Sequence, residues 1–319
     1  AENPHLVNPK KGYLASANNR ADVPGHSYYI TTEYLNPARA ERISRLIEAK
    51  PKHDVVDMQR IQYDVVDLAA GSIVPTIIHD LKDATGELAL ARTFLEKFVA
   101  SGYLADEDSV GTSIYMVFME KFRPAVFEDE LGSMAAPAAM VYLLDAGLGR
   151  ILDHPDSKWW DDVKTKPVER RKDIVERTMK ETIKYLRKEL GRDMLKWRWG
   201  DLSQLHLSPV FVPIPGSIKK NSRGPFPLPG TMDTVRAGDQ IFMGSMGFES
   251  AMGPTTHFIV DFQNPRRAFF NCTAGMSDNP KGGRYDNLTA DWLAGKYQVM
   301  SMDPAEWRDG MMGEVVFLP

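Results

Sequence analysis

The chain has 319 residues, with 39 Lys and Arg against 43 Asp and Glu, so its formal charge is −4. Hydrophobic residues make up 43% and charged residues 26%, a balance typical of a folded protein and not of a disordered one. The near-neutral charge disfavours nucleic-acid binding, which needs a clustered excess of Lys and Arg. Cys272 is the only cysteine, which excludes an intrachain disulfide and a zinc site built on cysteines.

No segment is expected to span a membrane. The longest apolar stretch, residues 131–144, is shorter than the ~20 residues that a spanning helix needs. The first five residues have neither the basic nor the apolar region of a signal peptide. Because the chain lacks an initiator Met and opens on an Asn-Pro loop, we interpret it as a processed piece of a longer precursor.

Turn-forming residues dominate the first 36 positions, where a short strand is expected around residues 13–15. Asn36-Pro37 then predicts the start of a helix, which Pro51 ends. Another helix is expected from Asp54. Its apolar face consists of Met58, Ile61, Val65 and Leu68.

Three longer helices are predicted by apolar residues at helical spacing, over 85–100, 109–123 and 167–190, and Gly191 ends the last of them. Past residue 200 the chain becomes rich in Pro and Gly. Short strands are expected there at 240–243, 257–262 and 267–270, and the last two predict a hairpin.

The sequence is therefore expected to divide into three parts. Residues 1–37 form a strand and loop segment, 38–199 a helical block whose helices run from about 38 to 192, and 200–319 a β-rich tail. The fold class is α+β.

Common catalytic motifs are absent. The sequence has no G-x-G-x-x-G, no P-loop, no H-E-x-x-H and no G-x-S-x-G nucleophile elbow. Its seven histidines include no pair at i, i+4, so no histidine metal site is expected. Cys272 has no base near it in sequence, which favours a small buried hydrophobe over a reactive thiol.

Two segments have both a structural and a functional interpretation. The paired residues Asn18 and Asn19 are typical of a turn, but a side-chain amide at the end of a strand can also donate to an oxyanion. Trp197 and Trp199 are expected either as packed aromatic anchors or as ligand contacts.

Several blocks, in this order, resemble the β-subunit of the penicillin acylase family. The similarity covers nearly the whole chain. The blocks are Gly12-Tyr13-Leu14-Ala15 with Asn18-Asn19, Pro24-Gly25 with Tyr28-Tyr29, residues 38–47, Gln62 with Asp64, residues 197–202, residues 230–235, Gly253-Pro254-Thr255 and residues 285–297.

The resemblance implies an N-terminal-nucleophile hydrolase with a four-layer αββα core, made as a self-cleaving precursor. In this family an N-terminal Ser attacks an amide carbonyl, and its own α-amine, whose pKa lies near neutrality, accepts the proton. The chain matches the β-subunit only after its start. The resemblance therefore implies that the nucleophile lies on an N-terminal β-segment, with an α-subunit as a further partner.

Two residues take roles from this resemblance. Asn18 matches the family's oxyanion-hole Asn, and Arg39 matches an Arg that holds the network around it. Arg39, at a helix start, also fits a plain surface or ion-pair residue. Substrate-binding residues stay unknown.

The resemblance implies a small-molecule amide as substrate and a periplasmic or secreted location. It implies no cofactor or metal ligand in this chain, and any structural calcium would lie on the missing part. The chain alone is expected to be inactive. Departures from the family pattern at residues 200–203, 234–236 and 273–278 leave the identity of the substrate open. The departure at 273–278 is also consistent with a second hypothesis, that of a non-catalytic binding or scaffold subunit.

Overall fold

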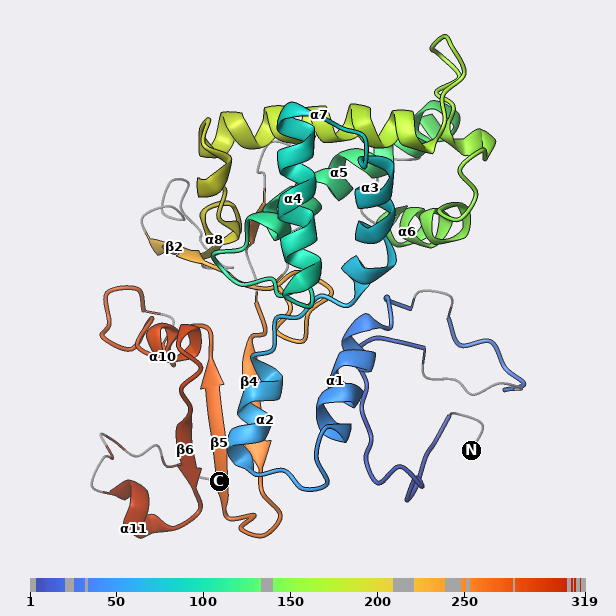
Figure 1. The fold of residues 1–319 in the computed structure, drawn as a ribbon. Helices are drawn as coiled ribbons and strands as arrows, with labels where there is room; N and C mark the ends of the chain where they lie inside the picture. The colour runs from blue at the N-terminus through green and yellow to red at the C-terminus, as the bar shows by residue number, and fades with distance from the viewer. Residues whose placement is uncertain are drawn as a thin grey trace.

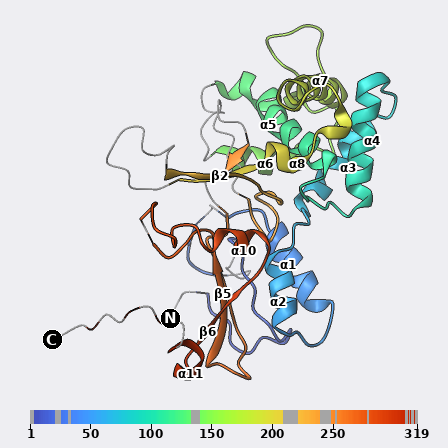
Figure 2. The ribbon, with the colours of Figure 1, turned by 90° about the vertical axis from the view of Figure 1, so that its left-hand side faces the viewer.

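The computed structural model describes residues 4–20, 26–31, 34–132, 140–208, 221–238, 248–250, 253–277 and 279–308, together with 311, 313 and 316. A block of helices forms one end of the molecule, and a small antiparallel sheet with the first two helices forms the other (Figure 1). In the turned view of Figure 2 the sheet strands still extend away from the helical block. No helix in the described ranges is both long and apolar enough to cross a membrane.

The first two helices, α1 (Ala38–Glu48) and α2 (Val55–Gln62), begin where the sequence predicts. The side chain of Asn36 accepts from Ala38 N at 2.9 Å, so it satisfies one of the free N–H groups at the start of α1. Asp54 caps α2 by accepting from Asp57 N at 2.9 Å.

Two expectations for this region are wrong. Residues 13–15 lie in irregular chain and not in a strand. Helix α2 ends at Gln62, so Val65 and Leu68 are not on its face. The next residues leave the helix because Asp64 forms a bidentate ion pair with Arg42 of α1, at 2.7 and 2.9 Å, and Val66 pairs with Leu104 in a β-bridge.

The helical block is built around α5 (Val110–Leu131), which packs against α4 (Gly86–Ala100) and α7 (Arg171–Leu190). The sequence predicts all three, although α5 continues through Pro124 for eight residues past its expected end at 123. Gly191 has a φ of +91° and ends α7, as expected. The remaining helical elements are η1 (Ala69–Ser72), α3 (Val74–Asp80), α6 (Met140–Ile151), η3 (Lys158–Trp160), η4 (Met194–Lys196) and α8 (Trp199–Leu202).

Gly111 allows α5 to approach α4 closely. A Cβ at this position would lie 2.5 Å from Phe98 Cβ and 2.7 Å from the carbonyl oxygen of Phe94. We therefore expect Gly111→Ala to lower the free energy of unfolding by about 1–3 kcal/mol, measured by urea denaturation. A Cβ added at Gly149 of α6 would have no neighbouring atom within 4 Å, so Gly149→Ala is the matched control, and an equal loss in both variants would contradict the prediction.

Two three-stranded sheets follow the helical block. One has the order β2-β1-β3, with β1 at Gln204–Leu207, β2 at Arg223–Pro227 and β3 at Glu249–Ser250. The other is antiparallel with the order β4-β5-β6, with β4 at Thr256–Val260, β5 at Arg267–Cys272 and β6 at Gln298–Ser301. The short helices α10 (Thr289–Leu293) and α11 (Pro304–Trp307) flank β6.

The pairing of β4 with β5, Thr256 opposite Cys272 and Val260 opposite Ala268, confirms the predicted hairpin. The strand expected at 240–243 lies outside the described residues. Trp197 and Trp199 are fully buried, and their indole N–H groups donate to the carbonyls of Gly191 and Gly230 at 2.8 and 2.9 Å. They are therefore packed anchors and not ligand contacts. The thiol of Cys272 is partly buried and lies 3.3 Å from the carbonyl oxygen of Ala274.

Candidate functional site

The two residues singled out in the sequence meet in the structure. Arg39, in the first turn of α1, donates from Nη2 to Oδ1 of Asn18 at 2.8 Å. Asn18 has a φ of +60°, in the left-handed region that asparagine tolerates better than most residues. Its carbonyl oxygen accepts from Leu35 N at 3.0 Å, which fixes the turn against the segment that leads into α1.

This hydrogen bond determines which end of the Asn18 amide is free. Because a guanidinium only donates, the atom facing Arg39 is the amide oxygen. The Nδ2 group, with two N–H donors, is left for another acceptor, and Asn18 is exposed. Such a preoriented donor is the kind of group that stabilises a developing oxyanion. The catalytic roles of Asn18 and Arg39 stay predictions.

A cavity of about 360 Å³ lies beside the segment that leads into α1, and its wall includes Leu35, whose N–H donates to the Asn18 carbonyl. It lies where the segment entering α1 faces α5, α6 and the turn that follows Gly230. Its wall combines apolar side chains with charged and hydroxyl groups. The lining residues are Tyr34, Leu35, Asn36, Pro37, Asp67, Tyr115, Met116, Met119, Glu120, Arg123, Asp145, Thr231, Met232 and Asp233.

Carboxyl groups dominate the charge of this cavity. Four carboxyl side chains line it against a single guanidinium, that of Arg123. Arg123 is already engaged, because its Nε lies 2.7 Å from Asp145 and its Nη1 lies 3.0 Å from Glu120. The other two carboxyl groups, Asp67 and Asp233, therefore have no cation of the cavity wall to themselves.

Asp67 is held by hydrogen bonds from uncharged donors. It is 1% exposed, and it accepts from the Thr231 hydroxyl at 2.8 Å and from Ala70 N, at the start of η1, at 3.1 Å. Burial raises the pKa of Asp67. Burial, and next the negative charge of Asp67, raise the pKa of Asp233 to about 7.

This raised pKa gives a pH-dependent stability. The folded state keeps a proton on Asp233 up to about pH 7, whereas an unfolded aspartate releases it near pH 4. The folded state thus binds more protons between these values, so the free energy of unfolding falls as the pH rises from about 4 to 7. We expect Asp233→Asn to flatten this decline in urea denaturation series at pH 5 and pH 8, and an unchanged slope would contradict the assignment.

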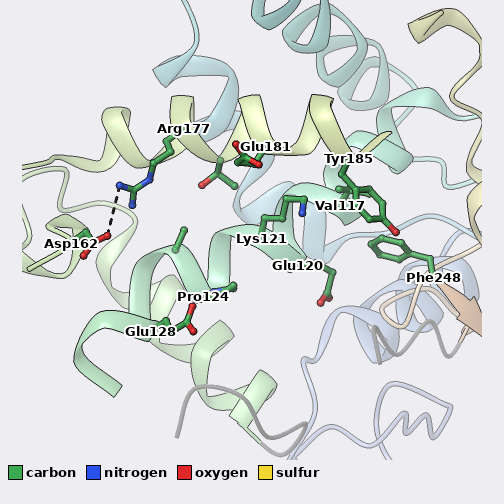
Figure 3. A pocket seen from close by; sticks show the side chains of 12 residues that line it. Val117, Glu120, Lys121, Pro124, Glu128, Asp162, Arg177, Glu181, Tyr185 and Phe248 are labelled. Carbon is green, nitrogen blue, oxygen red and sulfur yellow. Dashed lines mark ion pairs between the residues drawn. The ribbon is translucent and has the colours of Figure 1, made fainter. Parts of the chain in front are cut away.

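A second, larger cavity of about 630 Å³ lies between α5 and α7 (Figure 3). Lys121 Nζ lies 4.8 Å from the ring centroid of Tyr185, and Arg177 forms an ion pair with Asp162 at 3.9 Å. Neither Asn18 nor Arg39 lines this cavity. Neither residue lines the smaller cavity, but Leu35 in its wall donates to the Asn18 carbonyl, and the charge of Arg39 acts on Asp233 in the same wall. We therefore place the candidate site at the smaller cavity and not at the one of larger volume.

Sequence patterns alone miss most of this site. Asp233 belongs to the block 230–235 that carries part of the family resemblance, but the resemblance assigns it no role. Asp67 and Thr231 are 164 positions apart, and no local pattern predicts that they meet. The available signal was an acidic residue between two Thr residues just after a glycine, Gly230, whose φ is +86°.

The chain belongs to the penicillin amidase family, whose family model matches residues 1–309. It is 26% identical to the acyl-homoserine lactone acylase QuiP of Pseudomonas aeruginosa, over 94% of this chain and 39% of that protein. It is 27% identical to the protein of the same name from Pseudomonas syringae pv. syringae, over 96% of this chain and 39% of the relative. The chain thus spans about two fifths of the length of these relatives.

Among solved structures, a thermostable penicillin G acylase from Alcaligenes faecalis has a similar fold. The TM-score is 0.52 at 14% identity, and the likeness covers 99% of this chain and 58% of that chain. The family resemblance and the expected fold class are therefore confirmed: the chain is an α+β member of the penicillin amidase family, and its fold is similar to that of a penicillin G acylase. The division at residues 37 and 199 stays a prediction.

Proposed function

We propose that this chain is the part of an amide hydrolase that supplies one oxyanion-hole donor, the Nδ2 group of Asn18. The observation that carries the proposal is the hydrogen bond from Arg39 to Asn18 Oδ1, which orients the Nδ2 group and leaves it without an acceptor among the described residues. In the proposed reaction a nucleophile on another part of the protein attacks the amide carbonyl. Asn18 then stabilises the negative oxygen of the tetrahedral intermediate, and water hydrolyses the resulting acyl-enzyme.

In this reaction Arg39 is a positioning residue. Its guanidinium holds the Asn18 amide in one orientation, so the donor does not reorganise when charge develops on the substrate oxygen. The nucleophile is expected to be an N-terminal Ser on a β-segment that precedes this chain and is released by self-cleavage. An α-subunit would complete the protein, and its location would be periplasmic or secreted.

An uncovered sheet face supports the need for further protein. On the face shared by Phe258, Phe270 and Met300, the side chains of Phe258 and Met300 are 51% and 50% exposed. Large apolar side chains gathered on one sheet face are typical of a surface that packs against another layer. We propose that the rest of the protein covers this face.

The test is a substrate panel on the intact protein, read by release of free amine. Penicillins, acyl-homoserine lactones, and simple anilides or fatty-acyl amides sample the acyl donors that similar scaffolds serve. Hydrolysis of at least one of them, lost when the N-terminal nucleophile is replaced, would support the proposal. No release from any of them, and no partner chain that begins with Ser, Thr or Cys, would instead favour a binding or scaffold subunit.

A further inference from the structure

The cavity beside Arg39 has an electrostatic asymmetry that the proposed chemistry does not use. Arg123 forms ion pairs with Glu120 and Asp145, whereas no described cation forms an ion pair with Asp67 or Asp233. Within the described ranges, no group donates a hydrogen bond to the Asp233 carboxyl. Arg39, whose positive charge also acts on Asp233, is hydrogen-bonded to Asn18.

A second polar group in the same wall also lacks a partner. Tyr115 of α5 is 6% exposed and lines the cavity, and its hydroxyl has no hydrogen bond to any residue that the structure describes. Burial, followed by the charges of Asp67 and Asp233 in the same cavity wall, raises the pKa of Tyr115, so its hydroxyl stays protonated. The hydroxyl oxygen is not sealed from solvent, so it can pair with a molecule that enters the cavity.

The remaining wall is suited to an organic molecule and not only to water. Leu35, Pro37, Met116 and Met119 provide apolar surface around the polar groups. A cavity of about 360 Å³ lies within the range of small-molecule sites. Methionine side chains adapt to the shape of a ligand, so they would contact an alkyl or aromatic stem of variable shape.

We propose that this cavity is a subsite for an organic cation, an ammonium or guanidinium group that the substrate carries away from its scissile amide. The inference rests on the proposed function and names its substrate class: amides that bear a positive charge. The three N–H donors of a primary ammonium match the two aspartates and the Tyr115 hydroxyl. Its charge would also relieve the repulsion between Asp67 and Asp233.

Calorimetric titration of the intact protein with benzylammonium, and with benzyl alcohol as the neutral probe of similar shape, tests the subsite without any turnover. Benzylammonium is expected to bind at least tenfold more tightly than benzyl alcohol. Asp233→Asn should weaken benzylammonium binding about tenfold or more, and Tyr115→Phe about threefold. Glu181→Gln, at the separate cavity between α5 and α7, is the matched control and should leave binding unchanged.

Equal affinities for the two probes, or unchanged benzylammonium binding in Asp233→Asn, would overturn the inference. If Asp233→Asn fails to fold, Asp233→Glu is the second variant, because it keeps the carboxylate but moves it by one methylene group. Benzylammonium should then bind more weakly than to the starting protein, but its binding should not be abolished. Paired substrates separate this inference from the proposed function. N-acyl-lysine amide should be hydrolysed faster than N-acyl-norleucine amide. Hydrolysis of both substrates at the same rate would contradict only the cation subsite. Hydrolysis of neither substrate, with benzylammonium still bound, would contradict only the proposed amide hydrolysis.

Discussion

Replacement of Asn18 by alanine is expected to lower the kcat of the intact protein in the proposed amide hydrolysis about 10²- to 10³-fold, which corresponds to about 3–4 kcal/mol of lost transition-state stabilisation. The reason is geometric. Arg39 already occupies the amide oxygen of Asn18 at 2.8 Å, so the Nδ2 donor is preoriented and its loss is not compensated by rotation of another group. The KM should change far less than kcat, because a carbonyl oxygen in the ground state carries little charge for the donor to stabilise.

The neighbouring Asn19 provides the matched control. Its Oδ1 accepts from Ala17 N at 3.0 Å, so it stabilises the same turn without facing Arg39. Asn19→Ala should therefore reduce stability slightly and leave kcat within about threefold of the starting protein. Arg39→Gln, which removes the charge that orients Asn18, should fall between the two variants. Near-normal turnover by the Asn18→Ala protein would remove Asn18 from the mechanism.

Local signals in the sequence predicted much of the helical framework. Asp54 and Gly191 mark helix ends because capping depends on one side chain or one backbone conformation, and both are visible in the sequence. The 257–262 and 267–270 pattern predicted the β4–β5 hairpin because strand alternation and turn chemistry are also local. Where tertiary contacts decide, the prediction failed: the Arg42–Asp64 ion pair and the Val66–Leu104 bridge end α2 early.

The candidate site shows the same division. Asn18 and Arg39 were found through the family resemblance, and the structure adds that they are hydrogen-bonded. No local sequence pattern predicts the nearby cavity, because Asp67, Tyr115 and Asp233 come from three separate segments. Each looks ordinary in its own segment: a polar residue before a short helix, an aromatic residue within a largely buried helix, and a turn aspartate. These three residues form a cluster only because α5, which carries Tyr115, packs against the loops that carry Asp67 and Asp233.

The largest expected effect on stability comes from the buried ion pair that joins α3 to α7. Arg171, the first residue of α7, contacts Asp80 at the end of α3 at 2.7 and 3.0 Å, and it also donates to the carbonyl of Leu152. Asp80 and Arg171 are only 7% and 8% exposed. Arg171→Met should therefore lower the free energy of unfolding by about 3–5 kcal/mol, because it leaves a carboxylate buried without a partner.

Urea denaturation of three variants tests this expectation. Lys184, also on α7, forms an exposed ion pair with Glu181 at 3.5 Å, so Lys184→Met should cost less than about 1 kcal/mol. The double variant Asp80→Leu/Arg171→Met should lose less than Arg171→Met alone, since no unpaired charge remains in the interior. A loss in Arg171→Met as small as that in Lys184→Met would contradict the burial argument. Asp67 accepts a hydrogen bond from Ala70 N of η1, and η1 leads directly into α3. A loosened contact between α3 and α7 should therefore also loosen the position of Asp67 in the wall of the 360 Å³ cavity.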